Sequence, residues 1–132
     1  MTILETLPLF LAYFALSSLL MVAFVLIYTK ITPYDEFALI KQGLIAPAVS
    51  LSGAILGFVI ALASVIKNSV GLLDMVAWGV VAMVVQLLAF AVVRLGFRGL
   101  TDGINQNNTA KALILGVVSV AFGMLNAGCM TY

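Results

Sequence analysis

The chain has no histidine and very little charge. Of its 132 residues, 64% are hydrophobic and 8% are charged, with a formal net charge of +1. Soluble domains carry about 25% charged residues to cover their surface, so lipid must solvate this chain. The near-neutral charge provides no electrostatic footprint for nucleic acid, and we expect no nucleic-acid partner. The single cysteine, Cys129, excludes an internal disulfide and a cysteine-rich metal site.

Four apolar stretches dominate the sequence, and each approaches the roughly 20 residues that a helix needs to cross a bilayer. They cover about residues 7–28, 44–66, 75–95 and 112–131. The opening MTILETLPLF has no cationic n-region and no cleavage site follows, so we expect a retained first span. The connectors are short and carry nearly all the charge. We therefore predict an all-α integral membrane protein, with residues 1–132 forming a single domain of four transmembrane helices in a compact bundle.

The positions of lysine and arginine predict the orientation of the bundle. The first and third connectors contain five of these residues, Lys30, Lys41, Arg94, Arg98 and Lys111. The second connector contains only Lys67, and neither terminal tail contains any. Because cytoplasmic loops are enriched in lysine and arginine, we expect the first and third connectors in the cytoplasm and both termini in the periplasm.

A weak internal repeat relates the two halves of the chain. A shift of 64 positions places IKQGLIAPAVSL on INQNNTAKALIL without a gap, and identical residues meet at seven positions between residues 40–64 and 104–128. The glycines do not align well at this shift. The repeat predicts two parallel two-helix units related by an axis along the membrane normal.

Small residues line one face of the second and fourth spans. Gly53 and Gly57 form a GxxxG pair, and Gly116 and Gly123 occupy similar positions in the fourth span. Lipid gives helices no hydrophobic drive to associate, so close backbone approach must supply the contact. We favour a tight seam inside the bundle over the alternative, a contact between copies in a homo-oligomer.

Two amides lie within the apolar spans. Gln86 is near the middle of the third span, and Asn126 is closer to the outer end of the fourth. An interhelical hydrogen bond is favoured for each over a pore-lining role. No Asp, Glu, Lys, Arg or His lies deep in any span, which argues against a proton relay or a coupling-ion site. A passive pore lined by amide side chains or backbone groups remains an alternative.

The carboxylates do not form a catalytic pattern. Asp35, Glu36, Asp74 and Asp102 are interfacial and scattered, whereas acid–base catalysis needs titratable groups that converge in a cleft. We interpret Asp35 and Glu36 as a solvated approach to a helix. We expect no enzyme activity, no cofactor and no metal.

The segment INQNNTAKAL contains the most polar residues next to a span. Its asparagines lie at the expected cytoplasmic entrance of the fourth span, where Asn108 or Thr109 is a suitable N-cap. This structural interpretation is favoured, and a cytoplasmic-face site at Asn107 and Asn108 is the alternative.

Several segments together resemble a known family. YTKITPYDEFALIKQG, SLSGAILGFVIALAS, DMVAWGVVAMVVQLLAFAVVRL, NNTAKAL and NAGCMTY are similar to the bacterial YjfL-like membrane proteins, the domain of unknown function 350 family. The resemblance implies four spans in the bacterial inner membrane and no established activity. It also implies gene neighbours such as a phage-shock-like coiled-coil protein. One departure concerns the second span, where Leu44 occupies a position at which the family has an amide.

Two hypotheses for function follow. The first is a structural or accessory inner-membrane component of the membrane-stress type, a homo-oligomer in the lipid bilayer that contacts a cytoplasmic protein through its basic connectors. The alternative is a homo-oligomeric channel or facilitator for ions or small solutes, lined by Gln86 and Asn126.

Overall fold

The helices account for nearly all of the chain. A computed structural model describes residues 2–32, 35–96 and 99–130. Four of the described helices are long and apolar enough to span a membrane: α1 (Ile3–Ile31), α3 (Ile45–Asn68), α4 (Leu72–Gly96) and α6 (Thr109–Cys129). The predicted fold class, an all-α membrane protein of four spans, is confirmed. Arg98 and residue 131, which entered the predictions, lie outside the described residues.

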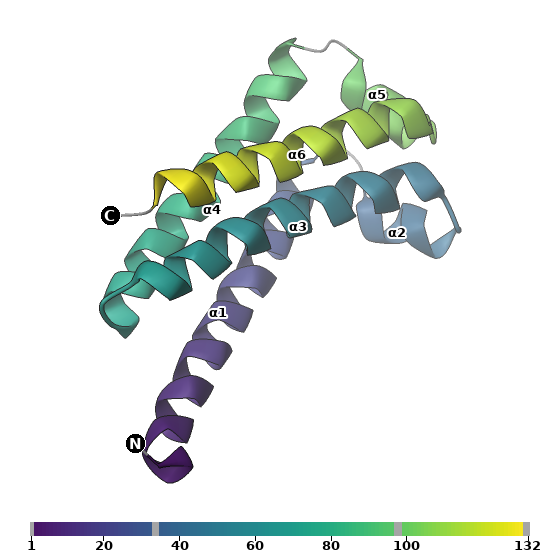
Figure 1. Cartoon of the computed structure of the whole chain (residues 1–132). Helices are drawn as coiled ribbons and strands as arrows, with labels where there is room; N and C mark the ends of the chain where they lie inside the picture. The colour runs from purple at the N-terminus through teal and green to yellow at the C-terminus, as the bar shows by residue number, and fades with distance from the viewer. Residues whose placement is uncertain (1, 33–34, 97–98, 131–132) are drawn as a thin grey trace.

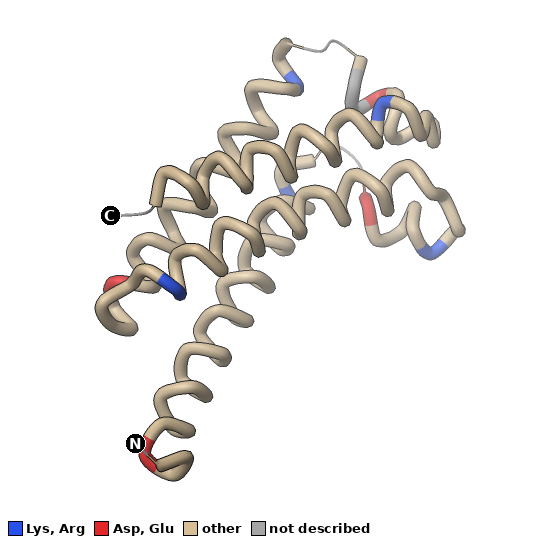
Figure 2. Tube along the Cα trace, in the orientation of Figure 1, with Lys and Arg blue, Asp and Glu red and all other residues tan. Residues whose placement is uncertain are grey.

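The long helices alternate in direction, so α3 and α6 run parallel to each other. Figure 1 shows these two helices side by side, with α1 and α4 crossing on one face of the pair. Both marked termini and the α3–α4 turn lie toward the left of the view, and α2 and α5 lie toward the right. Charged residues are found near the ends of the long helices, and their middles are uncharged (Figure 2).

The closest packing in the fold is the seam between α3 and α6, which four glycines make possible. A β-carbon on Gly53 would overlap the Cα of Gly116, and one on Gly57 would overlap the carbonyl oxygen of Ser119. A β-carbon on Gly123 would overlap the carbonyl oxygen of Gly57. The two backbones therefore touch along the seam, which provides the van der Waals contact that lipid cannot replace. The glycines of both small-residue faces thus lie against each other within one chain.

Aromatic rings hold α1 against the seam at one end of the helix. Phe24 stacks on Phe58 of α3 with ring centroids 4.6 Å apart. Tyr28 meets Phe90 of α4 edge-on at 5.2 Å. The remainder of α1 is largely exposed, with only 6% of its most apolar window buried. The exposed part of α1, away from Phe24 and Tyr28, is consequently free to face lipid.

The internal repeat is visible in the backbone. Two short helices, α2 (Glu36–Lys41) and α5 (Leu100–Asn105), precede α3 and α6 at an offset of 64 positions. Each short helix is followed by a left-handed residue at the same offset, Gly43 with φ of 83° and Asn107 with φ of 63°. The backbone N–H of Gly43 donates to Ile40, and that of Asn107 donates to Ile104. Both short helices thus end in the same turn.

The two short helices were not predicted from the sequence. The signals for α2 were present, since Asp35 is a suitable N-cap and Gly43 a suitable C-terminal stop. Asp35 indeed accepts a hydrogen bond from the Ala38 backbone N–H at 3.2 Å. A helix of six residues is too short to show a clear apolar period, which is why the connectors read as loops.

Candidate functional site

The side chain of Asn107 reaches across the seam and caps the neighbouring helix. Its Oδ1 accepts a hydrogen bond from the backbone N–H of Ala46 at 2.9 Å. The N-cap of α3 is Leu44, whose side chain cannot accept this bond. Pro47, one residue further on, has no N–H to satisfy. Asn107 therefore supplies to α3 the side-chain acceptor that Leu44 cannot provide.

Asn108 is the N-cap of α6. Its Oδ1 accepts a hydrogen bond from the Lys111 backbone N–H at 3.3 Å. Of the two N-caps considered for the fourth span, Asn108 is the one the structure shows. The two asparagines come together at the entrance of the seam, where each satisfies a helix N-terminus. This arrangement gives both residues a structural role as helix caps.

Gln86 and Asn126 both join α4 to α6. The Gln86 Nε2 donates to the Ser119 carbonyl at 3.1 Å, and the Asn126 Nδ2 donates to the Ala82 carbonyl at 3.3 Å. Both residues are at least nine-tenths buried. The Gln86 Oε1 is buried without a hydrogen-bond partner in the part of the chain described. These amides therefore face the protein interior. Neither of them lines the surface hollow along α6 or the one between α4 and α6.

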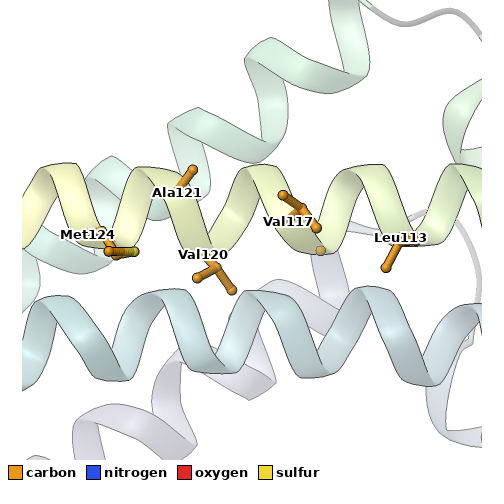
Figure 3. Close-up of a pocket in the computed structure, with 6 residues that line it drawn as sticks. Leu113, Val117, Val120, Ala121 and Met124 are labelled. Atoms are coloured by element: carbon orange, nitrogen blue, oxygen red, sulfur yellow. The ribbon is translucent and has the colours of Figure 1, made fainter.

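Two hollows of the surface are apolar. One, of about 330 Å³, follows α6 and is lined by Leu113, Gly116, Val117, Val120, Ala121 and Met124. Figure 3 shows these side chains along the helix, with only apolar groups among those drawn. A second, of about 260 Å³, lies between α4 and α6. Such surfaces suit hydrocarbon chains and offer no polar group to orient a solute.

Glu36 is buried, contrary to the prediction from the sequence. Asp35 is exposed as expected, but Glu36 is only 1% exposed, so the interpretation of this pair as a solvated approach is wrong for Glu36. The reason is α2, whose first residue turns inward as the helix packs on α3. Burial raises the pKa of the Glu36 carboxyl to about 7, and the Thr32 hydroxyl partly offsets this rise.

Comparison with known proteins places the chain in a family. A family model described as Domain of Unknown Function (DUF350) matches residues 1–130. The chain belongs to the DUF350 family. The resemblance noted in the sequence is thereby confirmed. As a member of DUF350 with four apolar helices, the protein is a multi-pass membrane protein.

Relatives in the family are similar along most of their length. The chain is 43% identical over 132 residues to the UPF0719 inner membrane protein YjfL of Escherichia coli K12, covering 100% of both chains. It is 29% identical over 126 residues to the UPF0719 transmembrane protein YshE of Bacillus subtilis, covering 88% of each. No solved structure matches the chain. The names of these relatives describe a membrane location and no activity.

Proposed function

We propose that this DUF350 protein is a noncatalytic structural or accessory component of the bacterial inner membrane. It forms a homo-oligomer in the bilayer and contacts a cytoplasmic protein through the end that carries α2 and α5. The main support for the proposal is the hydrogen bonding of the two intramembrane amides. Gln86 and Asn126 donate to helix carbonyls across the α4–α6 interface, so they act as interhelical links.

The surface hollows support the same conclusion. Neither the groove along α6 nor the hollow between α4 and α6 has a polar lining residue. A path for ions or polar solutes needs groups that replace water of hydration. The channel hypothesis would therefore need a path assembled from several copies with different residues exposed.

The lipid-facing surface is where self-association would occur. Gly53, Gly57 and Gly123 already face the α3–α6 seam within one chain, so they are not available to a second copy. In contrast, α1 leaves large side chains exposed, among them Phe10, Phe14 and Leu19. The groove on α6 offers a complementary hollow next to Val117, which is 60% exposed.

The cytoplasmic contact is proposed at the basic end of the bundle. Lys30, Lys41, Arg94 and Lys111 lie at or after the ends of the spans on that side. Two short helices present additional surface there. A basic, partly helical surface suits an acidic partner, and the interaction should weaken with salt.

Reconstitution into liposomes tests the accessory function against the channel. We expect no flux of ions or small solutes at protein densities at which a control channel gives a clear signal. Flux that depends on Gln86, measured as its loss in Gln86→Leu, would contradict the accessory function and establish the channel. Flux that persists in Gln86→Leu would also contradict it and place the path elsewhere.

Disulfide mapping tests the oligomer. In a Cys129→Ser background, Val117→Cys on α6 should cross-link to Leu19→Cys on α1 of another copy in native membranes. A matched control is Val70→Cys, which is 91% exposed in the α3–α4 turn and lies away from the groove. A monomeric mass in mild detergent, together with no cross-link above that control, would remove the oligomer from the proposal.

A further inference from the structure

Glu36 is a buried carboxylate beside the Thr32 hydroxyl. It is 1% exposed, and neither of its carboxylate oxygens has a hydrogen-bond partner among the residues described. Its neighbour Asp35 differs in both respects, because it is exposed and accepts a bond from the Ala38 N–H at 3.2 Å. A buried carboxylate of this kind is costly when ionised, so its presence requires an explanation.

No lysine or arginine among the described residues of the surrounding elements bonds to this carboxylate. Thr32, at the end of α1, donates its hydroxyl to the Thr29 carbonyl at 3.1 Å. Lys67 is the one lysine or arginine in α3 and lies in its last turn, roughly 30 Å along the helix. Within the described ranges, no titratable or charged group on the neighbouring elements bonds to Glu36; these groups are Tyr28, Lys30, Asp35, Lys41, Arg94, Asp102 and Lys111.

The internal repeat indicates that the fold does not need a carboxylate at this position. The first residue of α2 is Glu36, and the first residue of α5, 64 positions later, is Leu100. The two short helices end in equivalent turns, and each leads into one helix of the seam. An apolar residue thus begins one of the two equivalent helices. Glutamate at position 36 departs from the apolar residue at position 100, and its burial destabilises the ionised form of its carboxyl. Destabilisation of this kind is typical of a functional titratable group.

We propose that Glu36 is a proton-binding site that couples the packing of α2 on α3 to the pH at the inner face of the membrane. When the carboxyl holds its proton it is neutral, and α2 stays packed with Glu36 buried. When the proton leaves to water, the carboxylate requires hydration, and α2 loosens from α3 to provide it. The proton is the only species exchanged. The pKa of about 7 places both forms within the physiological range.

This inference is independent of the accessory function proposed above, since the same group would regulate a channel equally well. It also differs from a metal site. No group of three or more His, Cys, Asp or Glu side chains that could hold a metal ion occurs within the described ranges. A single carboxyl beside a single hydroxyl suits a proton better than a cation that needs several oxygen ligands.

Selective labelling measures the titration directly, because the chain contains only two glutamates, Glu5 and Glu36. We would label the full-length protein with ¹³Cδ-glutamate in nanodiscs and follow the carboxyl signals with pH. Glu5 is exposed and serves as an internal reference. We expect the signal that is absent in Glu36→Gln to titrate near 7. Titration of this signal at the ordinary glutamate value would overturn the proposal.

The same titration distinguishes a proton from an alkali cation. It is repeated with Na⁺ or K⁺ replacing choline at constant ionic strength. A midpoint independent of the cation supports proton binding. A midpoint that falls as Na⁺ or K⁺ rises means that the cation competes for the carboxylate, and it would replace the proton site with a cation site.

Thiol accessibility tests the movement of α2. In the Cys129→Ser background, Leu39→Cys reports a partly buried position that packs on the core, and Phe37→Cys reports a 47% exposed position on the same helix. The maleimide labelling rate of Leu39→Cys is divided by that of Phe37→Cys, and this ratio removes the effect of pH on thiol reactivity. We expect this ratio to rise several-fold through the Glu36 titration and to stay low in Glu36→Gln. A ratio that does not change with pH, or that changes equally in Glu36→Gln, would refute the coupling.

Discussion

The Cα of Gly116 occupies the place that a β-carbon on residue 53 would require. This relationship makes Gly53 and Gly116 a point of backbone contact between α3 and α6, and Gly57 and Gly123 repeat it further along the seam. At such positions even alanine is too large. The stability of the chain should therefore depend on these glycines much more than on glycines elsewhere.

Alanine substitution at the seam should destabilise the fold. Gly53→Ala and Gly123→Ala each insert a methyl group against backbone atoms, which cannot move aside as a flexible side chain could. Overpacking of this kind typically costs roughly 1–3 kcal/mol. Gly128→Ala, also in α6, is the matched control, because a β-carbon there meets nothing within 4 Å. Thermal unfolding in a mild detergent measures the difference. Equal midpoints for Gly123→Ala and Gly128→Ala would contradict the seam.

The sequence predicted these faces but not their partners. The spacing of Gly53 and Gly57, and that of Gly116 and Gly123, is enough to place small residues on one side of each helix. Spacing within a helix says nothing about which helix it meets. That pairing depends on the whole arrangement of four spans, so an oligomer contact and an internal seam were both compatible with the sequence.

Asn107 should contribute to stability in two separable ways. Asn107→Gly keeps the left-handed turn and removes the bond to the Ala46 N–H, which should cost about 1 kcal/mol, as for loss of an N-cap. Asn107→Ala removes the same bond and keeps a β-carbon in the left-handed conformation, which asparagine tolerates better than alanine and which glycine adopts without a steric penalty. The unfolding midpoint of Asn107→Ala should therefore lie below that of Asn107→Gly and below that of wild type. If glycine and alanine are equally destabilising, the left-handed turn is not retained in the protein.

Replacing Gln86 by leucine should have a small effect. The change removes the bond to the Ser119 carbonyl, and it also removes an Oε1 that is buried without a partner. Interhelical hydrogen bonds in membranes average about 0.6 kcal/mol, so we expect a loss of that order. Gln86→Glu is the contrasting variant, since it places a carboxyl at the same buried position and should lower the unfolding midpoint much further. A leucine variant as unstable as the glutamate variant would indicate a larger role for the amide.

Cys129 provides a native probe of orientation. It is exposed at the end of α6, on the side with both marked termini in Figure 1. With both termini in the periplasm, a membrane-impermeant maleimide added to spheroplasts should label Cys129. Gln42→Cys in a Cys129→Ser background, at the opposite end, should be labelled only after permeabilisation. The reverse pattern would invert the orientation and move the proposed partner contact to the periplasm.

The least predictable feature of the site is the burial of Glu36. Apolar length is enough to predict the spans, because it depends only on local composition. Whether an interfacial glutamate faces water or protein depends on how α2 packs on α3, and two adjacent carboxylates give no sign of it. Asp35 and Glu36 read alike in sequence, yet one caps the helix in solvent and the other is buried.

Glu36 should make the stability of the protein decrease as pH rises. Its pKa is 4.5 as an ordinary glutamate and about 7 when buried, so the folded state holds the proton more tightly than the unfolded state. The stabilising effect is complete below pH 4.5 and is lost as pH rises through about 7. The total change is on the order of 3 kcal/mol. Unfolding midpoints of wild type and Glu36→Gln should therefore diverge across this range. Asp35→Asn, which removes the adjacent charge and keeps a capping side chain, should follow wild type. A wild-type profile parallel to that of Glu36→Gln would show that the carboxyl is hydrated in the folded protein.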